Sequence, residues 1–297
     1  MTTKLEPIAL LGLGIMGSSM AVNFAKAGCT ISAWNRTKGR PAETAVINAG
    51  GRIAGSIKEA VANAKIIFIC LPDVPDVREL LFNDGGVMDS ALPGSFVVDT
   101  STTGPGFAKE VYDELKRSGM RFLDAPFSGG DVGGRDGTLT FMVGGDQSDF
   151  EVCKPYFEII GKLAFWCGPS GSGQAVKLCN QVLCAVNMMA VCEAMQLADA
   201  LGVPKQLMID ICKTGAGGSW ALSNLAPRLV QGDLSPGFVL DHMLNNLRLV
   251  HESTDIGNSR MVATELAVRL FKEVQGLELG KVGTQAMIRA YPCSNRN

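Results

Sequence analysis

Histidine is scarce in this chain of 297 residues, because only His242 and His251 are present. Two histidines are too few for a histidine-rich metal site and make a histidine-based catalytic triad an unfavoured interpretation, and we expect no metal site. If the chain is an enzyme, its proton chemistry would rest on lysine, a carboxylate or a hydroxyl.

Paired cysteines are also lacking. The nine cysteines are odd in number and contain no Cys-x-x-Cys pair, and several lie in apolar segments, as Cys70, Cys179 and Cys184 do. We expect free buried thiols rather than disulfides or a zinc site.

An excess of one charge is missing as well. The chain has 27 basic and 29 acidic residues, a net charge of −2, and no block of like charge. This balance argues against a nucleic-acid or membrane partner. No apolar run reaches membrane-spanning length, and Ile8–Leu11 is too short for a signal-peptide core. A cytoplasmic protein is expected.

The first half alternates short apolar strands with helical patterns. The expected strands are Ile8–Leu11, Ile31–Trp34, Ile66–Leu71, Phe96–Asp99, Phe122–Asp124, Thr138–Val143 and Leu163–Cys167. The expected helices are Gly17–Ala27, Ile57–Asn63, Asp76–Leu81, Gly106–Ser118 and Ser148–Ile160. This alternation predicts an α/β fold with a parallel, doubly wound sheet. Asp136-Gly137 predicts a tight turn into an antiparallel element.

The second half is predicted to be all-helical. The glycine- and proline-containing segment Gly168–Gly173 predicts a loop. The long apolar pattern after it, Gln174–Leu201, predicts a buried helix that joins the domains. The other expected helices are Pro204–Lys213, Ala221–Gln231, Phe238–Ser253, Met261–Gln275 and Thr284–Tyr291. We therefore expect a dinucleotide-binding domain over 1–168 and a helical domain over 169–297, suited to substrate binding and oligomerisation.

The most specific local motif is a glycine turn that directly follows the first strand and opens the first helix. Its residues are Gly12, Leu13, Gly14, Ile15, Met16 and Gly17. Such a turn lets a pyrophosphate approach the backbone and offers it the free N–H groups of a helix N-terminus. A plain glycine-rich turn is the alternative, but its place at the first strand–helix junction of a Rossmann-type pattern favours cofactor binding.

The second strand ends without the carboxylate that binds the ribose of NAD. Asn35-Arg36-Thr37-Lys38 follows it instead. A guanidinium can bind the 2′-phosphate of NADP through paired hydrogen bonds. We predict a preference for NADPH over NADH, with Arg36 on the phosphate and Asn35 and Thr37 assisting. The alternative is that Arg36 and Lys38 are ordinary loop charges.

Three motifs in order carry a family resemblance. The glycine turn continues as Ser18-Ser19-Met20-Ala21, and Asp124-Ala125-Pro126-Phe127-Ser128-Gly129-Gly130 and Gly171-Ser172-Gly173-Gln174-Ala175-Val176-Lys177-Leu178-Cys179-Asn180-Gln181 follow. With them the chain resembles the β-hydroxyacid dehydrogenase family over nearly its whole length. It is similar to 3-hydroxyisobutyrate dehydrogenases, tartronate semialdehyde reductases and glyoxylate/succinic semialdehyde reductases.

The resemblance implies hydride transfer between NAD(P)(H) and a small aldehyde acid or 3-hydroxyacid, in a homodimer or homotetramer. It implies that Lys177 shuttles the proton and that Asn180 orients the substrate oxygen. Ser128, Gly129 and Gly130 would hold the substrate carboxylate. Further implied contacts are to the substrate from Thr102, Gln181, Asn245 and Asn246, and to the cofactor from Leu71, Pro72, Asp73, Thr102 and Asn245.

Lys177 needs a physical reason to lie in so apolar a helix, since burying an unpaired charge is costly. Lys177, Asn180, Gln181 and Cys184 recur at helical spacing, so Lys177 and Asn180 share a face. The alternative is a lysine that extends its ammonium to solvent. The Ser128–Gly130 segment could equally be only a turn, although its N–H groups and hydroxyl suit a carboxylate.

One departure from the family pattern concerns Asn245-Asn246, where relatives usually have Lys-Asp. Two amides can hydrogen-bond but carry no charge, which leaves the substrate class open. Imine reduction on the same fold and a non-catalytic NADPH-binding protein remain alternatives. Lys177 and the Ser128–Gly130 segment argue for a carboxylate substrate and for catalysis.

Overall fold

A computed structural model describes residues 5–253 and 260–291 of the chain. It divides into two units, residues 1–177 and 178–297. The helix α9 (Ser172–Leu201) runs from the first unit into the second.

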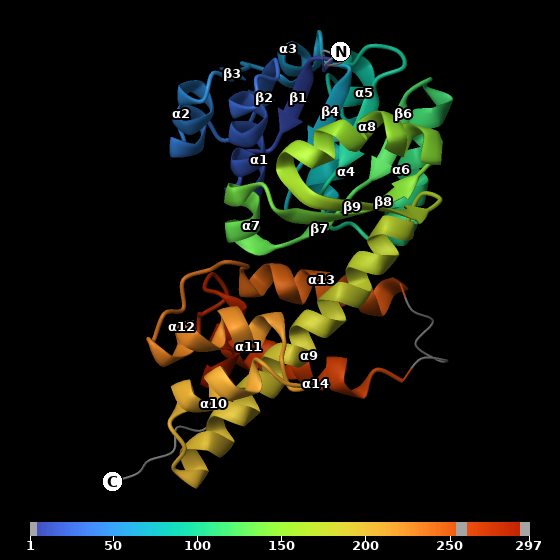
Figure 1. Cartoon of the computed structure of the whole chain (residues 1–297). Coiled ribbons are helices and arrows are strands. Elements are labelled where there is room, and N and C mark those ends of the chain that lie inside the picture. The colour runs from blue at the N-terminus through green and yellow to red at the C-terminus, as the bar shows by residue number, and fades with distance from the viewer. Residues whose placement is uncertain (1–4, 254–259, 292–297) are drawn as a thin grey trace. The chain divides into compact units, whose positions relative to one another are not determined.

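A nine-stranded sheet forms the centre of the first unit (Figure 1). Its strands are β1 (Ile8–Leu11), β2 (Ile31–Trp34), β3 (Arg52–Ile53), β4 (Ile66–Ile69), β5 (Phe96–Asp99), β6 (Arg121–Asp124), β7 (Phe127–Ser128), β8 (Leu139–Gly145) and β9 (Gly161–Gly168). The strand order is β3-β2-β1-β4-β5-β6-β8-β7, and β9 pairs with β8. The strands β1 to β6 pair in parallel, so the order reverses at β1 and β4 and creates the switch point where such sheets bind ligands.

Helices cover both faces of this sheet. They are α1 (Ile15–Lys26), α2 (Pro41–Asn48), α3 (Ile57–Val61), α4 (Val74–Phe82), α5 (Val87–Ser90), α6 (Pro105–Arg117), α7 (Gly130–Asp136) and α8 (Gln147–Ile160). Ile8 and Leu10 of β1 belong to one buried cluster, with Phe24 of α1. Ala9 and Leu11 belong to another, with Val111 of α6. A strand buried on both faces reads as a continuous apolar run, which is why the sequence marks β1 so clearly.

The second unit is helical after α9. It contains α10 (Lys205–Cys212), α11 (Trp220–Asn224), α12 (Ala226–Val230), α13 (Leu240–Ser253), α14 (Val262–Gly276) and the 3₁₀ helix η1 (Thr284–Ala290). Its fully buried side chains include Leu247, Phe271 and Met287. A backbone bridge between Val239 and Gly283 joins the segments before α13 and η1.

The expected fold class is confirmed: a Rossmann-type parallel sheet, a long helix and a helical C-terminal part. Several local expectations are wrong. Ala221–Gln231 is not one helix, because it breaks at Leu225 with Pro227 in the first turn of α12. The last helix is 3₁₀, and Gly137 ends α7 with φ 64° instead of forming a hairpin turn. The antiparallel element is confirmed, since β8 pairs antiparallel with β6 and β7.

Two expectations about apolar segments also need correction. The helix α9 is long and apolar enough to cross a membrane by length and composition alone, and 44% of its most apolar window is buried. A core helix passes the same test, so this finding by itself assigns no membrane. The cysteines described are free, but Cys179 is exposed rather than buried.

Candidate functional site

The glycine turn follows β1 at the switch point of the sheet. Gly12 has φ 104°, and a Cβ there would lie 2.3 Å from the carbonyl oxygen of Cys70. A Cβ on Gly17 would lie 2.0 Å from the carbonyl oxygen of Gly12. Around Gly14, by contrast, a Cβ would meet nothing within 4 Å. Packing therefore requires Gly12 and Gly17, whereas Gly14 leaves the backbone open to a ligand.

The first turn of α1 is open to an anion. Gly14 is its N-cap and offers no side-chain hydrogen bond, and the first turn has no acidic residue. The N–H groups of Ile15 and Met16 precede the first helical acceptors, so they suit the pyrophosphate of a dinucleotide. Residues 12–17 thus fit the cofactor group that the sequence predicts for them.

The loop after β2 is tied to the glycine turn by Asn35. Its Oδ1 accepts a hydrogen bond from the Leu13 N–H at 2.9 Å, and its Nδ2 donates to the Thr37 carbonyl at 2.7 Å. The exposed Arg36 pairs through Nη1 with Oδ1 of Asp76 at 2.7 Å. Sequence reasoning missed Asp76, because it lies 40 residues away on α4 and no local pattern links the two.

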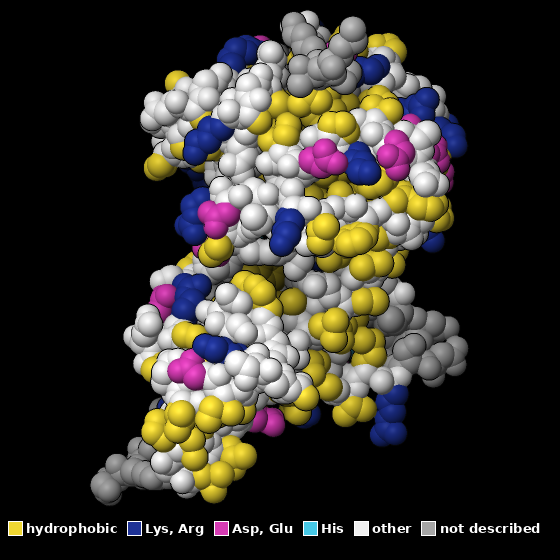
Figure 2. All heavy atoms as spheres, viewed as in Figure 1, with side chains coloured by type: hydrophobic (Ala, Val, Ile, Leu, Met, Phe, Trp, Pro, Cys, Tyr) yellow, Lys and Arg dark blue, Asp and Glu magenta, His cyan; other side chains and the backbone are white. Residues whose placement is uncertain are grey.

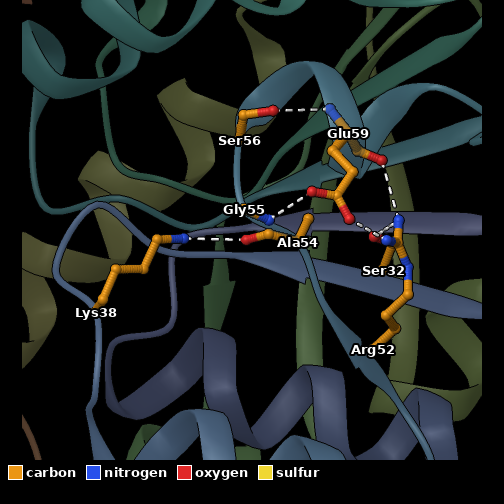
Figure 3. Close-up of polar contacts among 7 residues, drawn as sticks. All are labelled: Ser32, Lys38, Arg52, Ala54, Gly55, Ser56 and Glu59. Carbon is orange, nitrogen blue, oxygen red and sulfur yellow. Dashed lines mark hydrogen bonds and ion pairs between the residues drawn. The ribbon is translucent and has the colours of Figure 1, made fainter.

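Lys38, next in this loop, points toward the end of β3 (Figure 3). Its Nζ donates to the Ala54 carbonyl at 3.0 Å and lies 5.5 Å from the centre of the Trp34 ring. The next residue after Ala54 is Gly55, whose N–H donates to the Glu59 carboxylate at 2.8 Å (Figure 3). Lys38 therefore already has two partners, the Ala54 carbonyl and the Trp34 ring.

The loops after β4 and β5 are joined directly. The Leu71 N–H donates to Oγ of Ser101 at 3.0 Å, which places Leu71–Asp73 beside the loop that carries the half-buried Thr102. Asp73 caps α4, since its Oδ1 accepts the Asp76 N–H at 3.1 Å. The structure thus brings together two loops that the sequence assigns to the cofactor.

Two buried carboxylates end neighbouring strands. Asp99 of β5 and Asp124 of β6 are register partners. Burial raises the pKa of each to about 6, against the opposing hydrogen bonds from Ser101 and Gly171 respectively. Within residues 5–253 and 260–291, no group of at least three His, Cys, Asp or Glu side chains could hold a metal ion.

Asp124 and Gln174 fix the start of α9 to the sheet. Asp124 accepts the Gly171 N–H at 2.7 Å and the Gln174 N–H at 2.9 Å. The Gln174 side chain is fully buried; its Oε1 accepts the N–H groups of Thr103 and Gly104, and its Nε2 donates to the Ser101 carbonyl at 2.9 Å. The sequence assigned neither residue a role, although both lie inside its motifs.

Lys177 lies one turn further along α9. It is only 7% exposed, and its Nζ donates to the Phe127 carbonyl at 2.7 Å. The alternative of an ammonium extended into solvent is therefore wrong. Phe127 directly precedes Ser128, Gly129 and Gly130, whose glycines have φ 139° and 64°. The ammonium thus lies beside the turn that the sequence assigns to a substrate carboxylate, and that turn requires glycine.

The remaining expected residues lie in the second unit. Asn180 donates to Oε1 of Gln181 at 3.0 Å, and Gln181 is buried with its Nε2 3.9 Å from Sδ of Met243 on α13. On α13, Asn246 is buried, while Oδ1 of Asn245 accepts Nη2 of Arg248 at 2.8 Å. That contact draws the Asn245 amide into a surface pair with Arg248.

Comparisons with known proteins match both parts of the chain. A family model described as the NAD binding domain of 6-phosphogluconate dehydrogenase matches residues 7–168. A second, described as the NAD-binding domain of NADP-dependent 3-hydroxyisobutyrate dehydrogenase, matches residues 171–291. Fold and matches together define a nicotinamide-dependent oxidoreductase. The chain belongs to the β-hydroxyacid dehydrogenase family, which includes the 3-hydroxyisobutyrate dehydrogenases.

Individual relatives cover nearly the whole chain. An uncharacterised oxidoreductase of Synechocystis is 49% identical over 97% of this chain and 99% of its own length. The NAD-dependent L-serine dehydrogenase of Pseudomonas aeruginosa is 35% identical, over 90% and 92% respectively. The solved structure of 3-hydroxyisobutyrate dehydrogenase with L-serine from Mycobacterium tuberculosis has a TM-score of 0.85 at 30% identity, covering 96% of this chain and 98% of that one.

Gly14→Ala separates cofactor contact from folding. Because a Cβ there meets no protein atom, the variant should keep the wild-type melting temperature. It should weaken NADPH binding by at least about tenfold, since the methyl group occupies the approach to the backbone. Isothermal titration measures the loss. Gly106→Ala, in the first turn of α6 and equally free of neighbours, is the matched control; equal affinity of both variants would contradict the placement.

Gln174→Ala tests the anchoring of α9. It leaves three buried backbone groups without their partner and should lower the free energy of unfolding by about 3 kcal/mol, measured in urea. Gln147→Ala, at an exposed position of α8, should change it by less than about 0.5 kcal/mol. A similar small change at Gln174 would show that these hydrogen bonds do not hold the helix.

Proposed function

We propose that this protein reduces a small aldehyde acid, or oxidises the matching 3-hydroxyacid, with Lys177 as its general acid and base. The observation that carries the proposal is the buried Lys177 ammonium beside the Ser128–Gly130 turn. The substrates named for relatives support the same class: L-serine, and 2-hydroxy-3-oxopropionate for a reductase of Escherichia coli that is 35% identical over 83% of each chain.

The chain's own groups would divide the work as follows. A bound nicotinamide supplies or accepts the hydride. The Lys177 ammonium donates its proton to the oxygen that becomes a hydroxyl during reduction, and the neutral amine removes that proton during oxidation. One of the three N–H groups of the Lys177 ammonium donates a hydrogen bond to the Phe127 carbonyl, which helps to orient the other two. Asn180, three residues later on α9, orients the substrate oxygen.

The substrate carboxylate would bind at Ser128, Gly129 and Gly130. A hydroxyl and consecutive N–H groups in a positive-φ turn form a concave donor set for an anion. Thr102, Gln181, Asn245 and Asn246 would complete the substrate contacts. The neutral Asn245-Asn246 pair adds no charge to those contacts, so the carboxylate depends on the turn and on Lys177.

For the cofactor we propose NADPH in preference to NADH. Residues 12–17 would hold the pyrophosphate, Leu71–Asp73 would lie beside the nicotinamide ribose, and Arg36 would bind the 2′-phosphate with Asn35 and Thr37. The support is the Arg36 side chain, which follows β2 and is 67% exposed although it pairs with Asp76. The Pseudomonas aeruginosa relative is NAD-dependent, so the preference must be measured for this chain.

We also propose a homodimer or homotetramer. Hydrophobic side chains gather on the surface over α10 and the end of α9 (Figure 2). The exposed apolar residues of these two helices include Leu197, Leu201, Leu207 and Ile211. A contiguous apolar patch of this kind is typical of a subunit contact.

Imine reduction gains no specific support. The solved imine reductase of Myxococcus stipitatus shares the fold, with a TM-score of 0.63, but is only 18% identical. Likeness of fold does not carry the reaction. A non-catalytic NADPH-binding protein would not need the buried Lys177 ammonium beside the Ser128–Gly130 turn.

Lys177→Ala should lower kcat by about 10²–10⁴-fold with glyoxylate, succinic semialdehyde or tartronate semialdehyde, whichever the wild type reduces. NADPH oxidation measures the rate, and exogenous alkylamines should restore part of it, which a purely structural defect would not allow. The exposed Lys154→Ala is the control. A Lys177→Ala rate within about threefold of wild type would remove the assignment.

Arg36→Ala tests the cofactor preference. The variant should lose affinity for NADPH by about tenfold and keep its affinity for NADH, because only NADPH carries the phosphate that a guanidinium pairs with. The ratio of kcat/KM for the two cofactors gives the result. Lys38→Ala is the comparison, since Lys38 is already bound to the Ala54 carbonyl. An unchanged ratio in Arg36→Ala would take this residue out of the cofactor site.

A further inference from the structure

The loop after β2 faces an acidic residue that comes from a different part of the chain. Asp76 lies in the first turn of α4, and its side chain is 18% exposed. Its Oδ1 is 2.7 Å from Nη1 of Arg36, and Oε2 of Glu79, one turn later on α4, is 3.6 Å from the same nitrogen. The guanidinium proposed to bind a phosphate is thus already paired with carboxylates.

Lys38 cannot relieve this competition in its present position. Its Nζ donates to the Ala54 carbonyl, just after β3 (Figure 3). The ion-pair partners of Arg36 among the described residues are the two acids of α4. An approaching phosphate must displace Asp76 from Arg36 or share the guanidinium with it.

We infer that Asp76 is a specificity-determining residue that limits the preference for NADPH by competing with the 2′-phosphate for Arg36. The inference rests on the proposed function of Arg36. A phosphate that takes the guanidinium from Asp76 must break the existing ion pair, and a pair of opposite unit charges about 4 Å apart is worth about a factor of five in affinity even in water. NADH lacks the 2′-phosphate, so the Arg36–Asp76 pair stays intact when NADH binds.

The guanidinium that follows β2 therefore has a carboxylate beside it. The position that holds a ribose-binding acid in NAD-selective sites is Asn35-Arg36 here, and α4 supplies the carboxylate through space. The charges of Arg36 and Asp76 nearly cancel, so little net positive charge remains to attract the 2′-phosphate. The expected outcome is an enzyme that uses both cofactors, with NADPH favoured only modestly.

The test is a binding cycle on the full chain, with NADPH and NADH titrated separately at low ionic strength. Asp76→Asn keeps the size of the side chain and should tighten NADPH by about fivefold while NADH stays within about twofold. In the Arg36→Ala background, Asp76→Asn should tighten NADPH binding much less, because the guanidinium for which the carboxylate and the phosphate compete is absent. Asp113→Asn, an exposed acid on α6, controls for net charge.

The outcomes distinguish the two ideas. If Arg36→Ala lowers the NADPH-to-NADH affinity ratio but Asp76→Asn leaves it unchanged, the competition is refuted and the role of Arg36 stands. If neither substitution moves the ratio, both are refuted. An equal gain from Asp76→Asn with and without Arg36 would mean direct repulsion instead and would also overturn the competition. Melting temperatures check folding, and Asp76→Ala replaces the Asn variant if that one is unstable.

Discussion

The buried hydrogen bonds at the start of α9 set the position of Lys177, the residue proposed as the general acid and base. Asp124 binds two N–H groups of the helix start, and the Gln174 side chain binds three backbone groups of the loop after β5. Each of these buried groups would cost about 1–3 kcal/mol without its partner, so another placement of the first turn is strongly disfavoured. Lys177 follows within one turn, and its reach to the Phe127 carbonyl is a consequence.

Burial by itself would make an ammonium expensive to keep charged. Here the helix brings it to a backbone carbonyl and to a turn of positive-φ glycines, where donors and acceptors are already oriented. Asp124, in turn, is held by neutral N–H groups rather than by a cation, and burial dominates its electrostatics. The proposed acid–base residue and the carboxylate that anchors its helix are thus held by backbone groups more than by paired side-chain charges.

The sequence predicted those elements whose signal is local. β1, β2 and β5 have the expected bounds because their residues are apolar runs bounded by polar or glycine-rich segments. β3 and β7 were missed, because two residues carry no periodicity. The break between α11 and α12 was missed because the apolar pattern continues through Pro227. Lys177 and the glycine turns were found through motifs, whereas Asp76 and the anchoring role of Gln174 depend on contacts across 40 and about 70 residues.

The close packing of the glycine turn against the end of β4 also decides the chemistry of the thiol beside it. The carbonyl of Cys70 occupies the space next to Gly12, and burial raises the pKa of the half-buried Cys70 thiol to about 11. At neutral pH it is almost entirely protonated and therefore a poor nucleophile. Peroxides and alkylating agents would find little thiolate at Cys70, so this thiol should react slowly with both.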